Sequence, residues 1–432
     1  MSLRLGRVQT LVVLSAEMVK EVLKTKDLIF CNRAVLTGQR KLSYDNKDIV
    51  FSPYNEYWRQ VRKTCTLHLF SMKQVNSCRP VREAEVFDMI DMIKTRIAKK
   101  ELSCFWEKPV FLEPDRTAQI VQFNEYDDEQ QVTRFNELLL QCQSMFATFF
   151  YRDHFPLVGW LLDVLNGSMA RLEKNFKDMD EFYQELIDEH VNRTEPNNNQ
   201  EDMVDILLKI KQDSDCSFEL TYDHIKAVIM NILLGGTETS AATVVWAMTL
   251  LMKNPKSLKK VQQEVRNAIG NKGKVHEDDL YKLHYLKQET LRLYPIAPLL
   301  VPRESRDRCV LNGFEIPKKT LVYVNAWAVG RDPQCWDRPQ VFEPERFMGS
   351  SVDYKGTDFE LIPFGSGRRV CPGMSLGAAT VEVPLSNLVY SFDWEMPGGT
   401  GEIDTLTTPG TVAHKKNDLR LVAKVYDHGC GS

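Results

Sequence analysis

The chain has 432 residues, of which 43% are apolar and 26% are charged, and its formal net charge at neutral pH is −4. This ordinary globular composition excludes a disordered, collagen-like or coiled-coil chain, and the balanced charge gives no support for nucleic acid as the main partner. Ten cysteines are too dilute for a disulfide scaffold in a chain of this length. The length allows either about three domains or one large core.

The amino terminus contains no extended apolar segment. Residues 1–14 hold two arginines and one apolar run that is shorter than the core of a signal peptide. A membrane span requires roughly 18 apolar residues, and no segment of the chain is expected to reach that length. The sequence therefore predicts a soluble or peripheral chain.

The residue pattern predicts helices over most of the chain and short strands toward both ends. No repeat and no strong linker interrupts this pattern, so we predict one mainly α domain with minor β content over residues 1–432. In the first 100 residues we expect strands at 10–14 and 48–51 around a helix at 15–26, followed by helices from 56 to 100. Irregular chain at 101–133 then leads to helices from 135 to 190, a polar loop at 193–200 and helices from 201 to 295. Short runs broken by Pro and Gly follow, with a last helix after Gly373.

The longest periodic segment, residues 221–253, predicts a helix of about 50 Å at 1.5 Å per residue. Apolar residues on nearly every face indicate that it lies inside a large domain. Its centre holds the polar run 235–240 (GGTETS). Glycines weaken a helix by roughly 1 kcal/mol each, and a buried Glu238 must be paired or functional. A kink with a paired Glu238 and a functional groove both remain open at this point.

Cys371 differs from the other nine cysteines in its surroundings. It lies in the loop 363–373 (PFGSGRRVCPG), which enters a predicted helix at Met374. Glycines let backbone N–H groups approach the sulfur, a helix N-terminus stabilises an anion, and Arg368 and Arg369 add positive charge. These features favour a thiolate, the form that binds metal. A buried structural thiol is the alternative, and it is the default interpretation of the other cysteines.

A single thiolate narrows the choice of metal site. No second Cys or His lies at a spacing typical of zinc, whereas haem iron accepts one thiolate as its only protein ligand. The segment Phe364-x-x-Gly367-x-Arg369-x-Cys371-x-Gly373 resembles the haem-binding signature of the cytochrome P-450 superfamily. The resemblance implies a triangular helical haem domain with small β-sheets near both chain ends, and haem b with Cys371 as its axial iron ligand.

Other motifs follow in the order of that family. Residues 235–240 resemble the oxygen-activation groove on its long central helix. The resemblance implies that Gly236 lies beside bound O₂, that Thr239 holds a water molecule, and that Glu238 feeds protons to the distal oxygen. The protein then tunes the axial ligand, the proton supply and the access of substrate, while the chemistry is that of the cofactor.

A second motif is structural. Glu289 and Arg292 resemble the family's Glu-x-x-Arg pair, and Arg346 in the segment 342–347 (FEPERF) supplies a third charge. The resemblance implies a buried charge network that does not touch substrate.

Several residues are expected to hold the cofactor. The segment 58–62 (WRQVR) resembles the helix whose Trp58 and Arg62 reach a haem propionate. Arg303 and Arg369 resemble further propionate partners, in keeping with the pairing of arginine and carboxylate. Phe364 and Gly373 complete the cofactor-binding residues that the signature implies.

A closer resemblance is to plant microsomal members of the superfamily, and especially to the clade that oxidises aldoximes in glucosinolate and indolic metabolism. It rests on the segments 48–63, 169–190, 322–333 and 358–373. It implies a small apolar or aromatic substrate, with an aldoxime as one candidate, and a location on the cytosolic face of the endoplasmic reticulum membrane. By family position the substrate side would be lined by Ile296, Ala297, Leu299 and Leu300 and by residues within 41–50 and 231–234. Ordinary core packing is the alternative for each.

Two other functions are weaker hypotheses. Residues 373–377 (GMSLG) match a serine hydrolase elbow, with Asp404 and His414 downstream, but a loop ending in proline precedes them instead of an apolar strand. Residues 365–370 (GSGRRV) narrowly miss a dinucleotide-binding glycine motif, because Val370 stands where its third glycine would be.

The chain is therefore not expected to bind its own dinucleotide by this motif, and an oxidation would require electrons from a separate protein. The resemblance implies NADPH–cytochrome P-450 reductase as that protein.

The chain departs from the family in three places. It starts just before a strand that relatives place after a membrane helix, a proline-rich hinge and a first helix. It has about three residues fewer than relatives before Glu289, which would strain the charge network, and residues 104–124 lack an expected apolar helix. These departures raise the alternative hypothesis of a truncated or misspliced, inactive relative with impaired haem binding.

Overall fold

A computed structural model describes residues 1–99, 129–192, 201–212, 219–283, 288–399, 402–408 and 410–428. The polar loop at 193–200, the segment 284–287 just before the charge network and the departure at 104–124 lie outside the described residues. The stretch expected to be irregular, 101–133, lies outside them up to residue 128, and a helix begins at Glu129.

Helices dominate the described chain, as the apolar periodicity predicts. They are α1 (Ala16–Lys20), α2 (Asp27–Phe30), α3 (Thr37–Leu42), α4 (Glu56–His68), α5 (Met72–Ser77), α6 (Arg79–Ala98), α8 (Glu129–Ala147), α9 (Tyr151–His154), α10 (Gly159–Leu165), α11 (Ser168–Asn192), α12 (Met203–Gln212), α13 (Tyr222–Lys253), α14 (Pro255–Ile269), α15 (Glu289–Leu293), α16 (Ala326–Val329) and α17 (Met374–Ser391). Short turns of other helix types lie at Glu21–Thr25, Glu277–Lys282, Pro344–Phe347, Gly367–Arg369 and Pro397–Gly399.

The described residues form three small sheets, and the largest of them joins distant parts of the chain. The strands are β1 (Ser2–Leu5), β2 (Val8–Val13), β3 (Arg303–Glu304), β4 (Cys309–Leu311), β5 (Phe314–Ile316), β6 (Leu321–Val324), β7 (Phe392–Glu395) and β8 (Val422–Val425). The largest sheet has the order β1-β2-β6-β3, and the other two are the pairs β4-β5 and β7-β8. β2 and β6 are parallel with Thr10 opposite Leu321, so the amino terminus is fixed against a strand more than 300 residues away.

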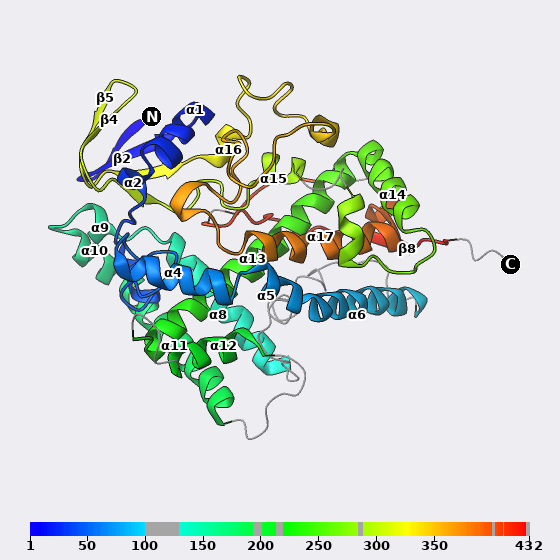
Figure 1. The fold of residues 1–432 in the computed structure, drawn as a ribbon, viewed down its shortest axis with the longest axis horizontal. Coiled ribbons are helices and arrows are strands. Elements are labelled where there is room, and N and C mark those ends of the chain that lie inside the picture. Colours follow the sequence, from blue (N-terminus) through cyan, green and yellow to red (C-terminus); the bar gives the residue numbers. More distant parts are fainter. Residues whose placement is uncertain are drawn as a thin grey trace.

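The long helix α13 runs through the interior, and α17 lies along it (Figure 1). Trp246 of α13 is fully buried, and the helix is unbroken through residues 235–240. By length and composition α13 could cross a membrane, contrary to the expectation that no segment reaches that length. However, 67% of its most apolar window is buried in the protein, as in the core helix of a large domain.

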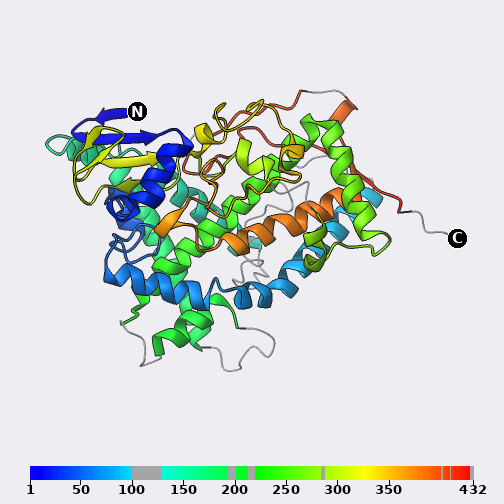
Figure 2. The same cartoon turned by 45° about the horizontal axis from the view of Figure 1, so that its top comes forward.

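The molecule is widest at the end that carries the large sheet and α9–α12, and it narrows toward α14 and the carboxyl terminus (Figures 1 and 2). The mainly α fold with small β-sheets, predicted from the resemblance, is therefore present. One predicted strand is wrong: residues 48–51 are a bent segment, because the carboxylate of Asp48 accepts the N–H groups of Phe51 and Ser52 that a neighbouring strand would otherwise bind.

Candidate active site

A cavity of about 280 Å³ lies between α13, α17 and loops from separate parts of the chain. Because its walls come from distant segments, it exists only in the folded protein. The lining includes Arg33, Ile49, Val50, Arg62, Gly235, Thr239, Ser240, Thr243, Ala247, Ile296, Ala297, Leu300, Val301, Arg303, Phe364, Arg369, Cys371, Ala378 and Leu385. A concave site with apolar walls and a few convergent polar groups is typical of a small-molecule site.

The loop before α17 brings Cys371 to the wall of this cavity. Gly367 has a φ of +70°, and a Cβ atom there would lie 2.1 Å from the carbonyl oxygen of Leu23, so only glycine fits. The N–H of Cys371 donates to the carbonyl of Phe364 at 3.0 Å, which closes the loop. The predicted helix after Gly373 is α17, and Gly373 is its N-cap and does not line the cavity.

The charge near the sulfur differs from the prediction. Burial raises the pKa of the Cys371 thiol, and the backbone N–H of Gly373 and the charge of Arg62 offset this rise in part. Arg368 instead lies 3.4 Å from Asp27, and Arg369 donates to the carbonyls of Cys31 and Ser52. The raised pKa disfavours a free thiolate at this position, whereas a bound metal would favour it, since metal binding displaces the proton of a thiol ligand.

Four arginines surround another part of the same wall. Arg33, Arg62, Arg303 and Arg369 all line the cavity, and burial lowers the pKa of each. Mutual repulsion adds to this effect for Arg33 and Arg303, and the pKa of Arg369 falls to about 9. Among the described residues, the carboxylate in contact with this cluster is that of Asp27, whose Oδ1 atom lies 3.2 Å from Nη1 of Arg303.

This cluster fits a bound anion. The Nη1 atom of Arg369 is buried and has no hydrogen-bond partner in the described part of the protein. A haem group, with a thiolate-binding iron and two carboxylates, would satisfy both this atom and the excess positive charge. The residues present therefore fit haem, although no single motif in the sequence marked Arg33 as a member of the cluster.

Trp58 supports the cluster from behind. The resemblance implies that Trp58 reaches a haem propionate. In the structure its indole N–H donates instead to the carbonyl of Ile49 at 2.9 Å, and the side chain does not line the cavity. The guanidinium of Arg369 lies 3.9 Å from the centre of its ring, and a cation over an aromatic face is attracted to it. Trp58 thus holds the arginine side chain in place.

One stripe of α13 faces the cavity. Gly235, Thr239, Ser240, Thr243 and Ala247 recur at the spacing of one helix face and line it together. The hydroxyl of Thr239 donates to the carbonyl of Gly235, one turn earlier in the helix. Gly235 lines the cavity, whereas Gly236, which the resemblance places beside O₂, is not among the lining residues.

Glu238 points away from this stripe. It is buried and lies 3.3 Å from Nε2 of His414, whose ring also contacts the amide oxygen of Gln143 at 3.3 Å. Burial raises the pKa of Glu238 and lowers the pKa of His414. In this arrangement Glu238 is paired and its carboxyl group does not line the cavity.

The expected substrate wall is placed only in part. Ile296, Ala297 and Leu300 line the cavity, but Leu299 is 43% exposed and lies outside the lining. Of residues 41–50 only Ile49 and Val50 contribute, and residues 231–234 do not. Leu299 faces outward because the chain turns at Leu300, whose φ is +51°.

The predicted charge network is formed. Arg292 donates to both carboxylate oxygens of Glu289 at 2.6 Å, and Arg346 lies 3.2 Å from the same carboxylate. Arg292 also donates to the carbonyls of Gly330 and Pro339, so the network joins α15 to the chain before Pro344–Phe347. The short segment before Glu289 does not prevent these contacts.

The serine hydrolase hypothesis does not fit the structure. Ser375 is the second residue of α17, and the residues before it form a turn and a loop instead of a strand. Asp404 pairs with Lys415 at 2.9 Å, and His414 pairs with Glu238.

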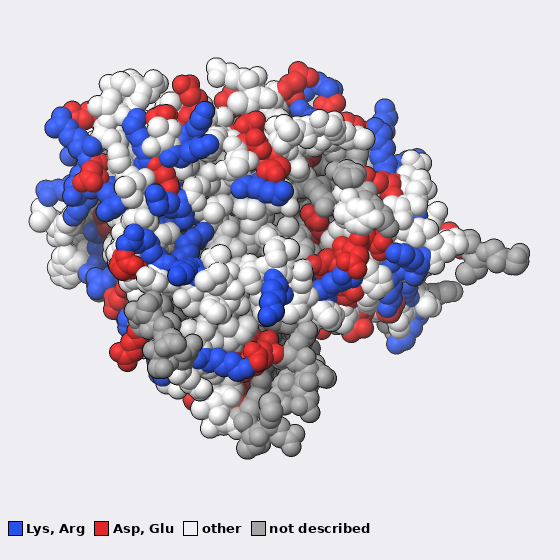
Figure 3. All heavy atoms as spheres, viewed as in Figure 1, with Lys and Arg blue, Asp and Glu red and all other residues white. Residues whose placement is uncertain are grey.

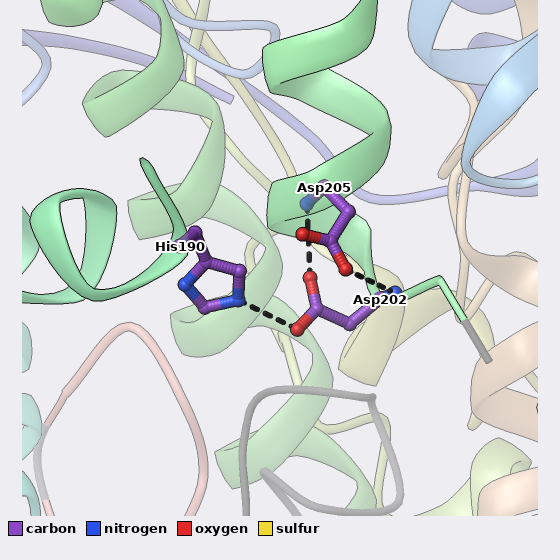
Figure 4. Close-up of side chains that lie close together, drawn as sticks. All are labelled: His190, Asp202 and Asp205. Carbon is purple, nitrogen blue, oxygen red and sulfur yellow. Dashed lines mark hydrogen bonds and ion pairs between the residues drawn. The ribbon is translucent and has the colours of Figure 1, made fainter. Parts of the chain in front are cut away.

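A second polar cluster lies between α11 and α12. His190, Asp202 and Asp205 meet there, with 2.7 Å between the imidazole and Asp202 (Figure 4). Asp202 also accepts the N–H groups of Val204 and Asp205, and Asp205 accepts the N–H of Asp202. These contacts cap the start of α12 and tie it to α11, so the cluster has a structural explanation.

The comparison with known proteins identifies the family. The profile described as Cytochrome P450 matches residues 1–422. The chain belongs to the cytochrome P450 family. It is 45% identical to "Cytochrome P450 71A1" of Persea americana over 98% of this chain and 86% of that protein, and 47% identical to "5-OH-xanthotoxin synthase" of Pastinaca sativa over 99% and 86%. A solved zebra fish cytochrome P450 with abiraterone has the same fold, with a TM-score of 0.80 at 22% identity over 99% of this chain and 96% of that one.

Family membership confirms the predicted class of protein. The chain is an oxidoreductase of the monooxygenase class with plant relatives, and this family uses haem with a thiolate iron ligand and O₂.

We predict that Glu289→Gln strongly destabilises the protein, since it leaves Arg292 charged, buried and without its carboxylate. Breaking one partner of a buried pair costs about 3–5 kcal/mol of the free energy of unfolding. Thermal unfolding and the yield of haem-loaded protein measure the loss. The control is Glu395→Gln, which breaks an exposed pair with Lys424 and should change neither quantity. Equal behaviour of the two variants would contradict a structural role for the network.

Proposed function

We propose that this cytochrome P450 is a haem-thiolate enzyme that inserts one oxygen atom from O₂ into a small apolar or aromatic plant metabolite, with electrons from NADPH delivered by a separate reductase. The observation that carries the proposal is the cavity itself. Cys371, the arginine cluster and the Thr239 stripe of α13 form different walls of one space.

Cys371 would ligate the iron, and Phe364 lines the cavity next to it. The haem propionates would bind to Arg62, Arg303, Arg369 and Arg33. The guanidinium groups of these four residues lie together on the cavity wall, and arginine pairs well with carboxylates. Bound haem supplies the activation of O₂. We assign all of these residues to one haem-binding domain that spans residues 1–432.

Thr239 and Glu238 would control the supply of protons. Thr239 is half-buried on the cavity side and can hold a water molecule there with its hydroxyl group. Burial raises the pKa of Glu238 and so favours the protonated form of its carboxyl group, the form that can donate a proton. Its carboxyl group must turn from His414 toward the groove to deliver that proton. The resemblance assigns Gly236, two residues earlier on the same helix, to the oxygen-binding side. The contact of 3.3 Å with His414 is loose enough to be broken in such a turn.

The substrate is best described as a planar aromatic molecule. Ile49, Val50, Ile296, Ala297 and Leu300 give the cavity apolar walls. Relatives at 45–47% identity are named for hydroxylated coumarin-type products, such as 5-OH-xanthotoxin and 6,7,8-trihydroxycoumarin. We therefore favour an aromatic ring hydroxylation over the aldoxime oxidation that the sequence resemblance also allows.

A basic surface supports the reductase as a partner. Figure 3 shows lysine and arginine side chains gathered over α1, α2 and α4, the side from which Arg62 reaches the Cys371 loop. Lys24, Arg59, Lys63 and Arg368 are exposed there. Positive charge on this face would steer an acidic electron-transfer partner toward the shortest route to the haem.

An apolar surface supports attachment to the endoplasmic reticulum membrane. Large apolar side chains in and around α9 and α10 are exposed, among them Phe155, Leu157, Val158, Trp160, Leu161, Val164 and Leu165. A patch this rich in exposed Leu and Trp is typical of a membrane or protein contact. We assign it to the membrane surface.

Replacement of the proposed iron ligand is the direct test of the site. We predict that Cys371→Ser abolishes the red-shifted Soret band that reduced thiolate-ligated haem gives with carbon monoxide, since serine does not supply a thiolate. The matched control is Cys335→Ser, which changes an exposed cysteine and should retain the band. A band that survives in Cys371→Ser would show that another residue ligates the iron.

The role of Thr239 is tested with an isosteric pair of variants. We predict that Thr239→Val lowers the fraction of NADPH electrons that reach product, and raises peroxide release, by about tenfold or more, since general acid–base groups contribute at least this much. Thr249→Val removes a hydroxyl from the same helix that donates to Val245 and does not line the cavity. It should leave the coupling unchanged. Full coupling in Thr239→Val would contradict the proton-supply role.

The membrane assignment predicts a measurable loss of binding. Leu161→Lys and Leu165→Lys together should lower the partition of the protein onto phosphatidylcholine vesicles by about tenfold or more, because two buried leucines contribute about 3 kcal/mol in lipid. Leu67→Lys on α4, also exposed, is the control and should partition like the unchanged protein. Equal partition of both variants in co-sedimentation would overturn the assignment.

A further inference from the structure

The bent segment formed by residues 48–52 is held by side chains instead of by a neighbouring strand. The N–H groups of Ile49 and Val50 donate to the amide oxygen of Asn231 at 3.0 and 3.2 Å. The N–H of Ser52 donates to Oδ1 of Asp48 at 2.9 Å, and that of Phe51 donates to both carboxylate oxygens at 3.0 and 3.1 Å. Val50 makes a longer second contact with Oδ2 of Asp48 at 3.3 Å. The backbone donors after Asp48 are thus satisfied without any regular structure, as a buried backbone requires.

The carbonyl groups of the same segment bind the arginine wall of the cavity. Ile49 accepts from the indole of Trp58 at 2.9 Å, and Val50 accepts from Arg33 at 2.8 Å. Ser52 accepts from Arg369 at 2.7 Å. The segment therefore connects the central helix α13 on one side to the residues that would bind the haem carboxylates on the other.

Asn231 and Asp48 also bind each other. The amide nitrogen of Asn231 donates to Oδ2 of Asp48 at 2.9 Å. Asp48 is fully buried, and burial raises its pKa to about 6 in spite of the hydrogen bonds that it accepts. The orientation of the Asn231 amide is determined by its neighbours, because two backbone donors need its oxygen and the carboxylate needs its nitrogen.

Neither polar side chain lines the cavity, yet the two residues that follow Asp48 do. Ile49 and Val50 form part of the apolar wall, and their backbone is fixed directly by Asn231. Asn231 lies one helical turn before Gly235, so its position is set by the same helix that carries the Thr239 stripe.

We propose that Asn231 and Asp48 are positioning residues that determine substrate specificity, because together they set where the Ile49–Val50 wall stands relative to α13 and the haem site. The proposal rests on the proposed function, since it concerns the substrate side of a haem cavity. The pair is directional: one partner donates and the other accepts. Either single exchange places like groups against each other, whereas exchanging both restores a donor opposite an acceptor.

The experiment uses this complementarity. The variants are Asn231→Asp, which opposes two carboxyl groups, Asp48→Asn, which opposes two amide groups, and the double exchange Asp48→Asn/Asn231→Asp. In the double exchange the amide introduced at position 48 keeps an oxygen for the N–H groups of Phe51 and Ser52, and its nitrogen donates to the acid introduced at position 231. Only the second, longer contacts of Val50 and Phe51 with Oδ2 are lost, and both N–H groups keep their other acceptor. Imidazole and 4-phenylimidazole are the probes, because both bind haem iron through the same ring and the second adds an aromatic ring that needs space in the cavity.

We expect each single exchange to change the ratio of the two dissociation constants, read from the Soret shift of the haem-loaded protein, by about fivefold or more, since each loses at least one buried hydrogen bond. The affinity for imidazole alone should change little. Hydrogen exchange of the amides at 49–52 should become faster in both single variants. The double exchange should restore the ratio to within about twofold and restore slow exchange.

The matched control is Asn387→Ala. Asn387 is a buried asparagine that bonds Val275 and Val383 away from the cavity. Its loss should lower the thermal stability and leave the probe ratio and the exchange at 49–52 unchanged. This separates a general effect on folding from an effect on the wall.

Two results would overturn the proposal. In the first, both single variants keep the ratio of dissociation constants and the hydrogen exchange of the amides at 49–52 of the unchanged protein. In the second, the double variant restores neither the ratio nor the slow hydrogen exchange. Hydrogen exchange and thermal unfolding are measured even in a variant that does not retain haem, so failed loading still gives a result. Failure of the proposed function is distinct, because it appears in the unchanged protein as the absence of a thiolate–carbon monoxide band.

Discussion

Buried positive charge is the constraint on which the rest of this site depends. Arg33, Arg62, Arg303 and Arg369 converge on one cavity wall, and Asp27 is the carboxylate in contact with them among the described residues. Holding four guanidinium groups out of water is costly unless an anion pairs with them. The protein reduces the cost with backbone carbonyls and the face of Trp58, and the binding of a dicarboxylate cofactor would complete the compensation.

The segments that satisfy these arginines also shape the substrate side. The carbonyls of Ile49, Val50 and Ser52 accept from Trp58, Arg33 and Arg369, while their amides are tied to Asp48 and Asn231. Cofactor side and substrate side thus share one short piece of backbone. A change on α13 at position 231 can therefore alter the wall without touching a ligand, because packed interiors transmit displacement.

Much of the fold and the centre of the site were predictable. The period of apolar residues indicated the long helix α13 with nearly correct ends. The start of the last helix α17 was placed after Gly373, and the Cys371 signature, with its glycines, marked the loop before it. Glu289, Arg292 and Arg346 formed the expected network. The strand prediction failed where side chains took over the hydrogen bonds that a neighbouring strand would make. Residues 48–51 have the composition of a strand, but Asp48 and Asn231 bind the amides that a strand would share.

The sequence by itself determined the family, the helical architecture and the identity of the cysteine at the cavity, because these depend on local pattern and on a motif of fixed spacing. Only the tertiary structure decided which neighbours face the cavity. Gly235 lines the cavity instead of Gly236, and Glu238 faces His414. Leu299 is exposed instead of lining the substrate wall. Arg33 joins the arginine cluster, and Arg62 supplies the positive charge near the Cys371 sulfur. The direction of a side chain and the sum of charges around a cavity depend on segments far apart in the chain, and no local pattern encodes them.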